Sequence, residues 1–370
     1  MMIRGHGGNI YELAETIGCR TADIVDMSSN MNPLGPPEGL IDFLRENLEK
    51  IDRLPEVDAF TAVKVFAAGW GIEPKNVLAG NGTTQFIYSL PLALQPRGVL
   101  IVGPAYSDYA DACAMHGIPF DFYLCREDRA FQPDFSEIGR KKGFDTVFFC
   151  NPNNPTGVLT PRQDLIALIR AFPKTRFIVD ESYLPFVDRW EKESLIPERL
   201  PNVIVLYSMS KFFRIPGLRI GFLIAPDSLM HLQLRYALPW SVNSLSQLAV
   251  EYLAARTDEI EAFIERSRSY LAAQRSFLLD RFGSSPFIRF YPSATSYLLG
   301  RLNGKHTAES IFDFLCRRKI LIRNCSNFIG LSNRFIRISL KSKDVNERLV
   351  ECLMEAFETG ASESEPSGGI

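Results

Sequence analysis

The chain has 370 residues, of which 46% are hydrophobic and 23% are charged, and its formal net charge is -2. This length allows two domains, and this composition is typical of a soluble globular enzyme. The near-neutral charge and the lack of a long apolar run predict neither a nucleic-acid partner nor a membrane partner. Seven scattered cysteines without a C-x-x-C pair, four distant histidines and an N-terminus without an apolar core predict a cytoplasmic protein with no disulfide framework and no metal site.

Five short apolar runs predict the strands of a mostly parallel sheet. Each run is continuous rather than alternating, which is typical of strands that are covered on both faces. A helical pattern at 162–172 separates two of the runs. The runs are 99–102, 146–149, 177–179, 203–206 and 220–224.

The pattern changes at about Ser246, where a smaller α+β domain is predicted to begin. Its predicted helices are 247–255, 260–279, 308–318 and 345–357, and its predicted strands are 287–299, 320–323 and 335–340. The polar tail is predicted to be disordered. The predicted division is an N-terminal arm at 1–32 that joins the small domain, a large domain at 33–245, a small domain at 246–358 and the tail at 359–370.

Polar motifs follow four of the apolar runs, at the points where the strands should end. They are GPAYSDY after 99–102, CNPNNPTG after 146–149, DESY after 177–179 and SMSK after 203–206. In open α/β sheets, ligands bind beyond the carboxyl ends of the strands. The four motifs therefore predict one shared site.

Lys211 lies among apolar side chains in VLYSMSKFFRIPGLRIGF. A buried ammonium is costly unless it is paired or used in chemistry, and a lysine can form a Schiff base with an aldehyde cofactor. The alternative is a lysine whose amine reaches solvent from a strand end. Ser208, Ser210 and Arg219 favour the cofactor, because hydroxyls and a guanidinium fork suit a phosphate group.

The stretch LAGNGTTQFI at 78–87 indicates an anion-binding loop. Gly80 and Gly82 permit a tight backbone, and the amides of Gly82, Thr83 and Thr84 would lie at the start of a predicted helix, where anions bind. An ordinary helix start is the alternative, because the motif is neither G-x-G-x-x-G nor a P-loop.

Side chains in the strand-end motifs also suit an aromatic cofactor. Asp180 can stabilise a protonated pyridine nitrogen, Tyr183 can donate to a phenolate oxygen, and Tyr109 can stack on a ring. Each has an ordinary alternative, which is a helix cap or surface acid for Asp180 and a core position for Tyr109. Asn154 precedes a proline in NPNNPTG, a sequence that also forms plain turns.

The order of these motifs resembles that of the fold type I pyridoxal-phosphate enzymes, the aspartate aminotransferase superfamily, over residues 6–357. The resemblance implies an α/β, aspartate-aminotransferase-like large domain with a mostly parallel sheet, a smaller α+β C-terminal domain, pyridoxal 5'-phosphate as cofactor, and a homodimer. The implied roles are the Schiff-base lysine for Lys211, the pyridinium partner for Asp180, donors to the ring O3' for Asn154 and Tyr183, ring stacking for Tyr109, phosphate contacts for Gly82, Thr83, Ser208, Ser210 and Arg219, and the substrate carboxylate for Arg337.

Within the superfamily, four stretches resemble the threonine-phosphate decarboxylases of cobalamin biosynthesis. They are HGGNIYELAETIG at 6–18, SSNMNPLGPP at 28–37, LPWSVNSL at 238–245 and ILIRNCSNFIGL at 320–331. This resemblance implies decarboxylation of L-threonine O-3-phosphate to (R)-1-aminopropan-2-yl phosphate. A histidinol-phosphate aminotransferase is the alternative, and a non-catalytic pyridoxal-phosphate-binding protein is a third interpretation.

A phosphorylated amino acid presents two anionic groups, and arginine forks suit both. The candidates for holding this substrate are His6, Asn32, Arg323 and Arg337, with Lys341 in addition, and which arginine takes which anion stays open. The chain departs from the family at two positions. Leu54 replaces a tyrosine that commonly reaches the cofactor phosphate of the other subunit, and Ser296 replaces a common asparagine.

Overall fold

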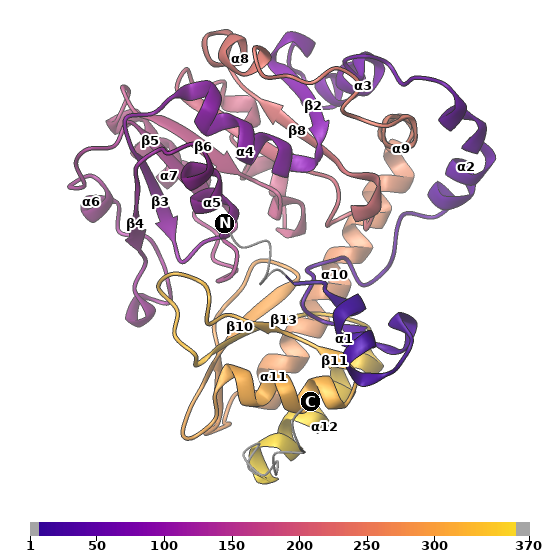
Figure 1. Cartoon of the computed structure of the whole chain (residues 1–370), viewed down its shortest axis with the longest axis vertical. Helices are drawn as coiled ribbons and strands as arrows, with labels where there is room; N and C mark the ends of the chain where they lie inside the picture. The colour runs from indigo at the N-terminus through magenta and orange to yellow at the C-terminus, as the bar shows by residue number, and fades with distance from the viewer. Residues whose placement is uncertain (1–6, 360–370) are drawn as a thin grey trace. The chain divides into compact units, whose positions relative to one another are not determined.

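The structure is a computed structural model that describes residues 7–359 of the chain (Figure 1). Within this range the chain forms two compact units. The first unit contains residues 34–154 and 158–268, and the second contains residues 7–33, 155–157 and 269–359.

The first unit is built on a seven-stranded sheet in the order β2-β8-β7-β6-β5-β3-β4. Neighbouring strands from β4 to β7 run parallel, whereas β8 runs antiparallel to both β7 and β2. All five predicted strands are present, and the predicted mostly parallel α/β sheet is confirmed. The strands are β2 (Val77–Asn81), β3 (Val99–Gly103), β4 (Phe120–Leu124), β5 (Thr146–Cys150), β6 (Arg176–Asp180), β7 (Val203–Ser208) and β8 (Ile220–Ile224).

Eight helices belong to the described part of this unit in full. They are α2 (Leu40–Glu46), α3 (Phe60–Trp70), α4 (Gly82–Leu94), α5 (Asp108–Met115), α6 (Phe135–Ile138), α7 (Arg162–Ala171), α8 (Asp227–Leu234) and α9 (Ser244–Ala254). Phe86 of α4 and Tyr109 of α5 share one core with Phe148 of β5 and Ile178 of β6. Burial of each such side chain contributes about 2 kcal/mol, so these helices are fixed against the sheet.

The direction of β8 determines where its flanking residues lie. Because β8 runs opposite to β7, its first residue lies at the same edge of the sheet as the last residues of β5, β6 and β7. The residue that precedes β8, Arg219, therefore lies at the edge where ligands bind in this class of sheet.

The second unit contains an antiparallel sheet in the order β12-β13-β10-β9 and a short parallel pair of β1 with β11. Figure 1 shows β10 and β13 side by side, as their register requires. The strands are β1 (Val25–Asp26), β9 (Ile288–Phe290), β10 (Tyr297–Leu302), β11 (Ile320–Leu321), β12 (Arg323–Asn324) and β13 (Phe335–Ser339), and the helices wholly inside the unit are α1 (Ile10–Ile17), α11 (Ala308–Arg317) and α12 (Lys343–Thr359).

The single strand predicted at 287–299 is wrong, because the structure divides it into β9 and β10. Pro292 lies between them and has no N–H to donate to a neighbouring strand. The Ser293 hydroxyl then accepts a hydrogen bond from the backbone N–H of Thr295 at 3.1 Å, which holds a local turn instead of a ladder.

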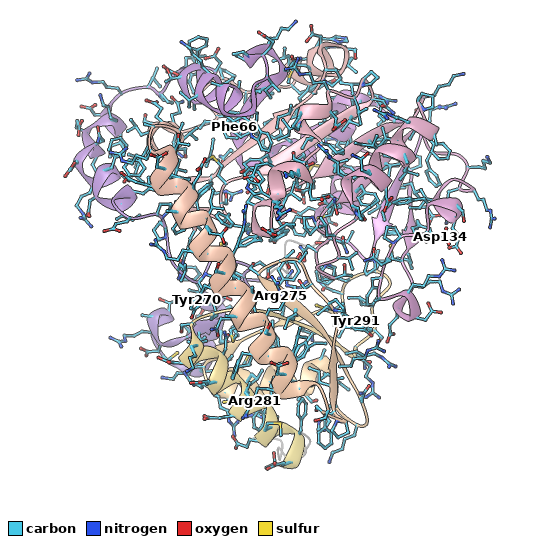
Figure 2. All side chains as sticks on the ribbon, turned by 180° about the vertical axis from the view of Figure 1, so that it is seen from behind. Phe66, Asp134, Tyr270, Arg275, Arg281 and Tyr291 are labelled. Carbon is cyan, nitrogen blue, oxygen red and sulfur yellow. The ribbon has the colours of Figure 1, made fainter. Side chains whose placement is uncertain are left out.

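The boundary between the units also differs from the predicted one at 245/246. The helix α10 (Thr257–Phe282) crosses from the first unit into the second between Arg268 and Ser269. Figure 2 shows this long helix, and the labelled Tyr270 and Arg275 lie on its second-unit part. The preceding helix, α9, packs against α2 and α3 and therefore belongs with the large sheet.

Two sequence predictions fall outside the part of the chain that the structure describes. They are His6 as a substrate residue and nearly all of the tail at 359–370. Among the described helices, none combines the length and the apolar character that a membrane crossing requires.

Candidate active site

The register of three strands brings the predicted phosphate residues together. Asn81 pairs with Ile220, and Gly221 pairs with both Gly80 and Ser208. The residues just beyond these pairs therefore converge. A Cβ atom placed on Gly82 would lie 2.4 Å from Nη2 of Arg219, so the guanidinium lies directly against this glycine.

The start of α4 leaves its amides available to an anion. Its N-cap residue, Asn81, makes no side-chain capping bond, and Thr83 is buried in the first turn. Ser208 and Ser210 are also buried, and the amide of Ser210 donates to the Ser208 hydroxyl at 3.3 Å. A helix start, two hydroxyls and a guanidinium form a donor set that suits a phosphate group.

Replacing Gly82 with alanine is expected to weaken cofactor binding about tenfold and to lower the free energy of unfolding by about 1–2 kcal/mol. The reason is that Gly82 has φ of 72° and has no room for a Cβ beside Arg219. Fluorescence titration with pyridoxal phosphate and denaturant unfolding measure the two effects. Gly217→Ala is the matched control, because a Cβ on Gly217 would meet no atom within 4 Å. Equal affinities for both variants would contradict this account of the loop.

Asp180 lies at the end of β6 and is 5% exposed. One carboxylate oxygen accepts a hydrogen bond from the Tyr109 hydroxyl at 2.7 Å, and the other accepts one from the Ser182 amide at 2.9 Å. Burial raises the pKa of Asp180, while these donors and the positive charge of Lys211 oppose the rise. Lys211, three positions beyond the last residue of β7, is part-buried and close enough to Asp180 to interact with it electrostatically.

Asn154 and Tyr183 are both buried, and they follow the carboxyl ends of two neighbouring strands. Asn154 follows β5, whose last residue, Cys150, pairs with Asp180. Tyr183 follows β6 by three positions, and the carbonyl of Asp180 accepts a hydrogen bond from the Asn151 amide at 2.9 Å. The two strand-end loops that carry Asn154 and Tyr183 are therefore neighbours, as the sequence predicted.

The position of Tyr109 does not favour the ring-stacking role that the sequence analysis gave it. Tyr109 is 1% exposed, and its ring stacks on Phe148 with ring centres 4.8 Å apart. Tyr106 from the same motif is part-exposed, lies edge-on to Tyr109 and interacts electrostatically with Tyr183. The Y-x-x-Y motif contains both tyrosines as candidates for stacking. The helix α5 begins at Asp108, so the buried Tyr109 lies on the helix and the more open Tyr106 lies before it.

Glu181 is a buried acid that sequence reasoning passed over. It is 1% exposed, and its carboxylate accepts hydrogen bonds from the Ser194 hydroxyl at 2.6 Å and from the Leu195 amide at 2.8 Å. Burial raises the pKa of Glu181 from 4.5 to about 7, against the effect of these donors. Since neighbouring residues of a strand point to opposite faces, Glu181 anchors the 194–195 segment while Asp180 faces Tyr109.

The free energy of unfolding is expected to fall by up to about 3 kcal/mol through Glu181 as the pH rises from about 4.5 to about 7. The sign follows because the folded state binds this proton more tightly than the unfolded state does, so the stabilisation is present at low pH and lost at higher pH. Denaturant unfolding at pH 5 and pH 8 measures how much the free energy of unfolding changes with pH in wild type and in Glu181→Gln. Glu46→Gln, a change at an exposed acid, is the control. If the free energy of unfolding changes with pH equally in Glu181→Gln and in wild type, Glu181 does not titrate in this range.

In the second unit, two predicted substrate residues form a cross-strand pair. Arg323 of β12 lies directly opposite Arg337 of β13, so their side chains leave the same face of the small sheet. Arg337 is 5% exposed and donates to the Ser28 carbonyl at 2.6 Å. Asn32 is fully buried in the same unit, and Lys341 donates to the Ser29 carbonyl at 3.4 Å.

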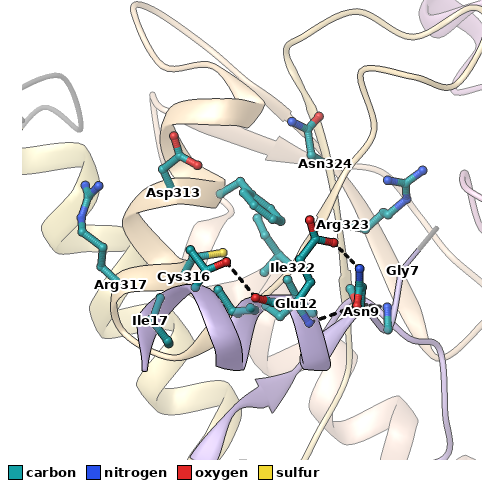
Figure 3. Close-up of a pocket in the computed structure, with 16 residues that line it drawn as sticks. Gly7, Asn9, Glu12, Ile17, Asp313, Cys316, Arg317, Ile322, Arg323 and Asn324 are labelled. Atoms are coloured by element: carbon teal, nitrogen blue, oxygen red, sulfur yellow. Dashed lines mark hydrogen bonds between the residues drawn. The ribbon is translucent and has the colours of Figure 1, made fainter. Parts of the chain in front are cut away.

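A cavity of 490 Å³ in the second unit includes Arg323 in its lining (Figure 3). Its other walls come from residues 7–9 and the helix α1 that follows them, from Ser28, from α11 and from the β11–β12 segment. Figure 3 shows Glu12 and Asn9 joined by hydrogen bonds on one side, with Asn324 on the other. The cavity therefore gives Arg323 an open space within its own unit.

The candidate residues form two groups, one in each unit. All ten residues predicted to hold the cofactor lie in the first unit. The described substrate candidates, Asn32, Arg323, Arg337 and Lys341, lie in the second. The residues of the first unit fit pyridoxal phosphate on their chemistry, because an amine, a buried carboxylate and a phosphate-type donor set occur at one edge of the sheet.

Comparison with known proteins agrees with this geometry. A model of the family described as aminotransferase class I and II matches residues 22–353. Threonine-phosphate decarboxylase of Salmonella typhimurium is 34% identical over 355 residues, which are 94% of this chain and 95% of the relative. Histidinol-phosphate aminotransferase of Thermoanaerobacter sp. is 30% identical over 341 residues, which are 89% of this chain and 92% of the relative.

Two further matches extend the comparison. The adenosylcobalamin biosynthesis bifunctional protein CobDQ of Leptospira interrogans is 31% identical over 96% of this chain, and the match spans 41% of that longer protein. The crystal structure of L-threonine-O-3-phosphate decarboxylase from Porphyromonas gingivalis superposes with a TM-score of 0.80 and 30% identity, over 90% of this chain and 100% of that one. With the family model matched over most of its length, the chain belongs to the class I and II aminotransferases, a family of pyridoxal-phosphate-dependent enzymes with the fold type I architecture.

Proposed function

We propose that the protein is a pyridoxal-phosphate-dependent decarboxylase that converts L-threonine O-3-phosphate to (R)-1-aminopropan-2-yl phosphate for cobalamin biosynthesis. The observation that carries the proposal is the cross-strand pair of Arg323 and Arg337. Two guanidinium groups on one face suit a substrate with a carboxylate and a phosphate. The Salmonella and Porphyromonas relatives, which bear the decarboxylase name, support this choice over nearly the full chain, and the name of the Leptospira relative supports the pathway.

The proposed roles in the first unit follow from its contacts. Bound pyridoxal phosphate supplies an electron sink for the breaking of a bond at the substrate α carbon. The Lys211 amine holds the cofactor and later donates a proton to the α carbon, and Asp180 holds the proton on the ring nitrogen. Asn154 and Tyr183 donate to the ring oxygen, and we give the stacking role to Tyr106, the more open tyrosine of its motif.

The proposed phosphate contacts of the cofactor are the amides of Gly82 and Thr83, the hydroxyls of Ser208 and Ser210, and the guanidinium of Arg219. The bond that would break at the α carbon depends on how the anionic groups of the substrate are held. Since Arg323 and Arg337 are the proposed partners of these anionic groups, they would determine whether the bond to the carboxylate or the bond to the proton breaks. The reaction type is therefore assigned to the second unit and not to the cofactor residues.

An aminotransferase that acts on histidinol phosphate or a related amine is the second candidate, supported by the Thermoanaerobacter relative. Its amine substrate has one phosphate and no carboxylate, whereas 2-oxoglutarate, which accepts the amino group, has two carboxylates that the arginine pair also suits. A pyridoxal-phosphate-binding protein without catalysis is the third candidate. The decarboxylase names of the Salmonella and Porphyromonas relatives favour the first candidate over both.

Incubation of the loaded protein with L-threonine O-3-phosphate is expected to release carbon dioxide without any keto acid. Gas release and amine formation are measured together, with and without 2-oxoglutarate. Conversion that requires 2-oxoglutarate and forms glutamate would instead establish the aminotransferase. Cofactor binding without turnover of threonine phosphate or histidinol phosphate would leave the non-catalytic candidate.

We also propose that the protein is a cytoplasmic homodimer. Five apolar side chains of the first unit, each at least half exposed, form what we call the apolar face: Leu54, Val57, Phe60, Leu238 and Trp240. The Trp240 amide donates to the Val57 carbonyl at 2.8 Å, which joins the two segments of this face. Large exposed apolar patches favour a protein partner, here a second copy. All seven cysteines are free, which supports a reducing compartment.

The homodimer is tested by sedimentation of wild type and of a variant with Leu238→Glu and Trp240→Glu. We expect a wild-type dimer and a folded monomeric variant. A wild-type monomer would contradict the proposal.

A further inference from the structure

We propose that Tyr109 is a positioning residue, which holds the Asp180 carboxylate ionised and oriented toward the ring nitrogen of the cofactor. In this role Tyr109 contacts Asp180 and does not stack on the cofactor ring. The inference rests on the cofactor site proposed above, but it depends on neither of the proposed substrates.

The geometry of the contact carries the inference. The Tyr109 hydroxyl donates to Oδ2 of Asp180 at 2.7 Å between two buried side chains. This length is typical of a hydrogen bond from a hydroxyl to a carboxylate anion, which is about twice as strong as one between neutral groups. The ring is fixed in turn, because it stacks on Phe148 at an interplanar angle of 11°.

Tyr109 is a permanent donor. Burial and the neighbouring Asp180 charge raise the pKa of the Tyr109 phenol well above its usual value, so the hydroxyl keeps its proton at neutral pH. A tyrosine has one hydroxyl proton to donate, and here this proton is directed at Asp180. The contact therefore favours the charged carboxylate over the protonated acid.

Other groups around Asp180 act in both directions. Lys211, beyond β7, favours the carboxylate anion through its positive charge, and the Ser182 amide donates to the other oxygen. Glu181 on the same loop and Cys150 at the end of β5 also interact electrostatically with Asp180. Among the titratable side chains of the described residues around Asp180, Tyr109 is the one that donates a hydrogen bond to the carboxylate. Without the Tyr109 hydroxyl, the Asp180 carboxylate would lose one of its two hydrogen-bond donors and keep the other, the Ser182 amide.

The test is Tyr109→Phe, which removes one oxygen and keeps the ring that packs on Phe148. Tyr252→Phe is the matched control, because the buried Tyr252 hydroxyl donates to the Glu38 carbonyl at 2.8 Å, away from this carboxylate. Each apo variant is titrated with pyridoxal phosphate by fluorescence, and the absorbance of the loaded protein is followed against pH. Unfolding of the apo forms measures any structural loss.

We expect the dissociation constant of pyridoxal phosphate to rise about tenfold in Tyr109→Phe, and the midpoint of the absorbance change to move by about one pH unit. Tyr252→Phe should lose comparable stability and change neither value. In an Asp180→Asn background, Tyr109→Phe should add less than about a twofold change, because the two residues act through one contact.

Two results would overturn the inference while the cofactor site stands. One is a wild-type dissociation constant and pH midpoint in Tyr109→Phe, and the other is a full additional loss in the Asp180→Asn background. Failure of the wild-type protein itself to bind pyridoxal phosphate would overturn both the inference and the proposed function.

Discussion

Replacing Lys211 with alanine is expected to lower turnover by more than about a thousandfold and to leave the bound cofactor without a covalent link. Lys211 has two proposed roles, as the amine that holds the cofactor and as the acid that returns a proton to the α carbon. Loss of a positioned acid alone costs about 10²–10⁴-fold in rate. Borohydride reduction followed by mass spectrometry measures the link, because wild-type protein should gain the mass of the reduced cofactor at Lys211.

The control for this variant is Lys75→Ala. Lys75 also belongs to the first unit, but its side chain is 65% exposed and forms an ion pair with Asp227 at 2.8 Å. Its removal should leave turnover and the reduced adduct unchanged, because exposed ion pairs contribute little. An adduct on another lysine, or wild-type turnover in Lys211→Ala, would contradict the assignment of the cofactor lysine.

The continuous apolar runs predicted the buried strands of the large sheet, since strands covered on both faces need no polar positions. Two strands of that sheet were not predicted. The edge strand β4 has the sequence FDFYL, in which Asp121 interrupts the apolar residues, so it is not one of the continuous runs that marked the other strands. The strand β2 ends in Gly80 and Asn81, residues that indicate a turn when they are read locally. The segment forms a strand by pairing with β8, and such pairing between distant segments cannot be predicted from either segment alone.

The site shows the same division between local and long-range information. The motifs predicted Asp180, Lys211 and the two serines because they follow apolar runs, and Gly82 and Thr83 because they lie in a glycine-containing stretch before a predicted helix. The pairing of Arg323 with Arg337 was beyond the sequence, since it depends on the register between β12 and β13. Likewise, the Y-x-x-Y motif could not tell Tyr106 from Tyr109, because the choice depends on which ring the core around Phe148 accepts.

Asp180→Asn should lower turnover by about 10²–10³-fold, the range seen when a single preorganised electrostatic partner is removed from an active site. An amide has no charge to hold the proton on the ring nitrogen, so the cofactor would lose much of its capacity to accept electrons. The Ser182 amide can still donate to the new side chain at the carbonyl oxygen, and the fold should therefore persist. The expected signature is altered absorbance of the bound cofactor against pH, together with the loss of turnover.

The acid at the opposite end of the same sheet provides the control. Asp145 immediately precedes β5, is largely buried and forms an ion pair with Arg176 at 3.2 Å, so Asp145→Asn also removes a partly buried charge from the first unit. This variant should lose stability, because the Arg176 charge is left without its partner, while the absorbance and turnover of the loaded protein stay as in wild type. If both variants lose turnover equally, the loss comes from damage to the sheet, and Asp180 has no special role toward the ring nitrogen. If only Asp180→Asn loses it, the carboxylate that Tyr109 supports is the one on which the chemistry depends.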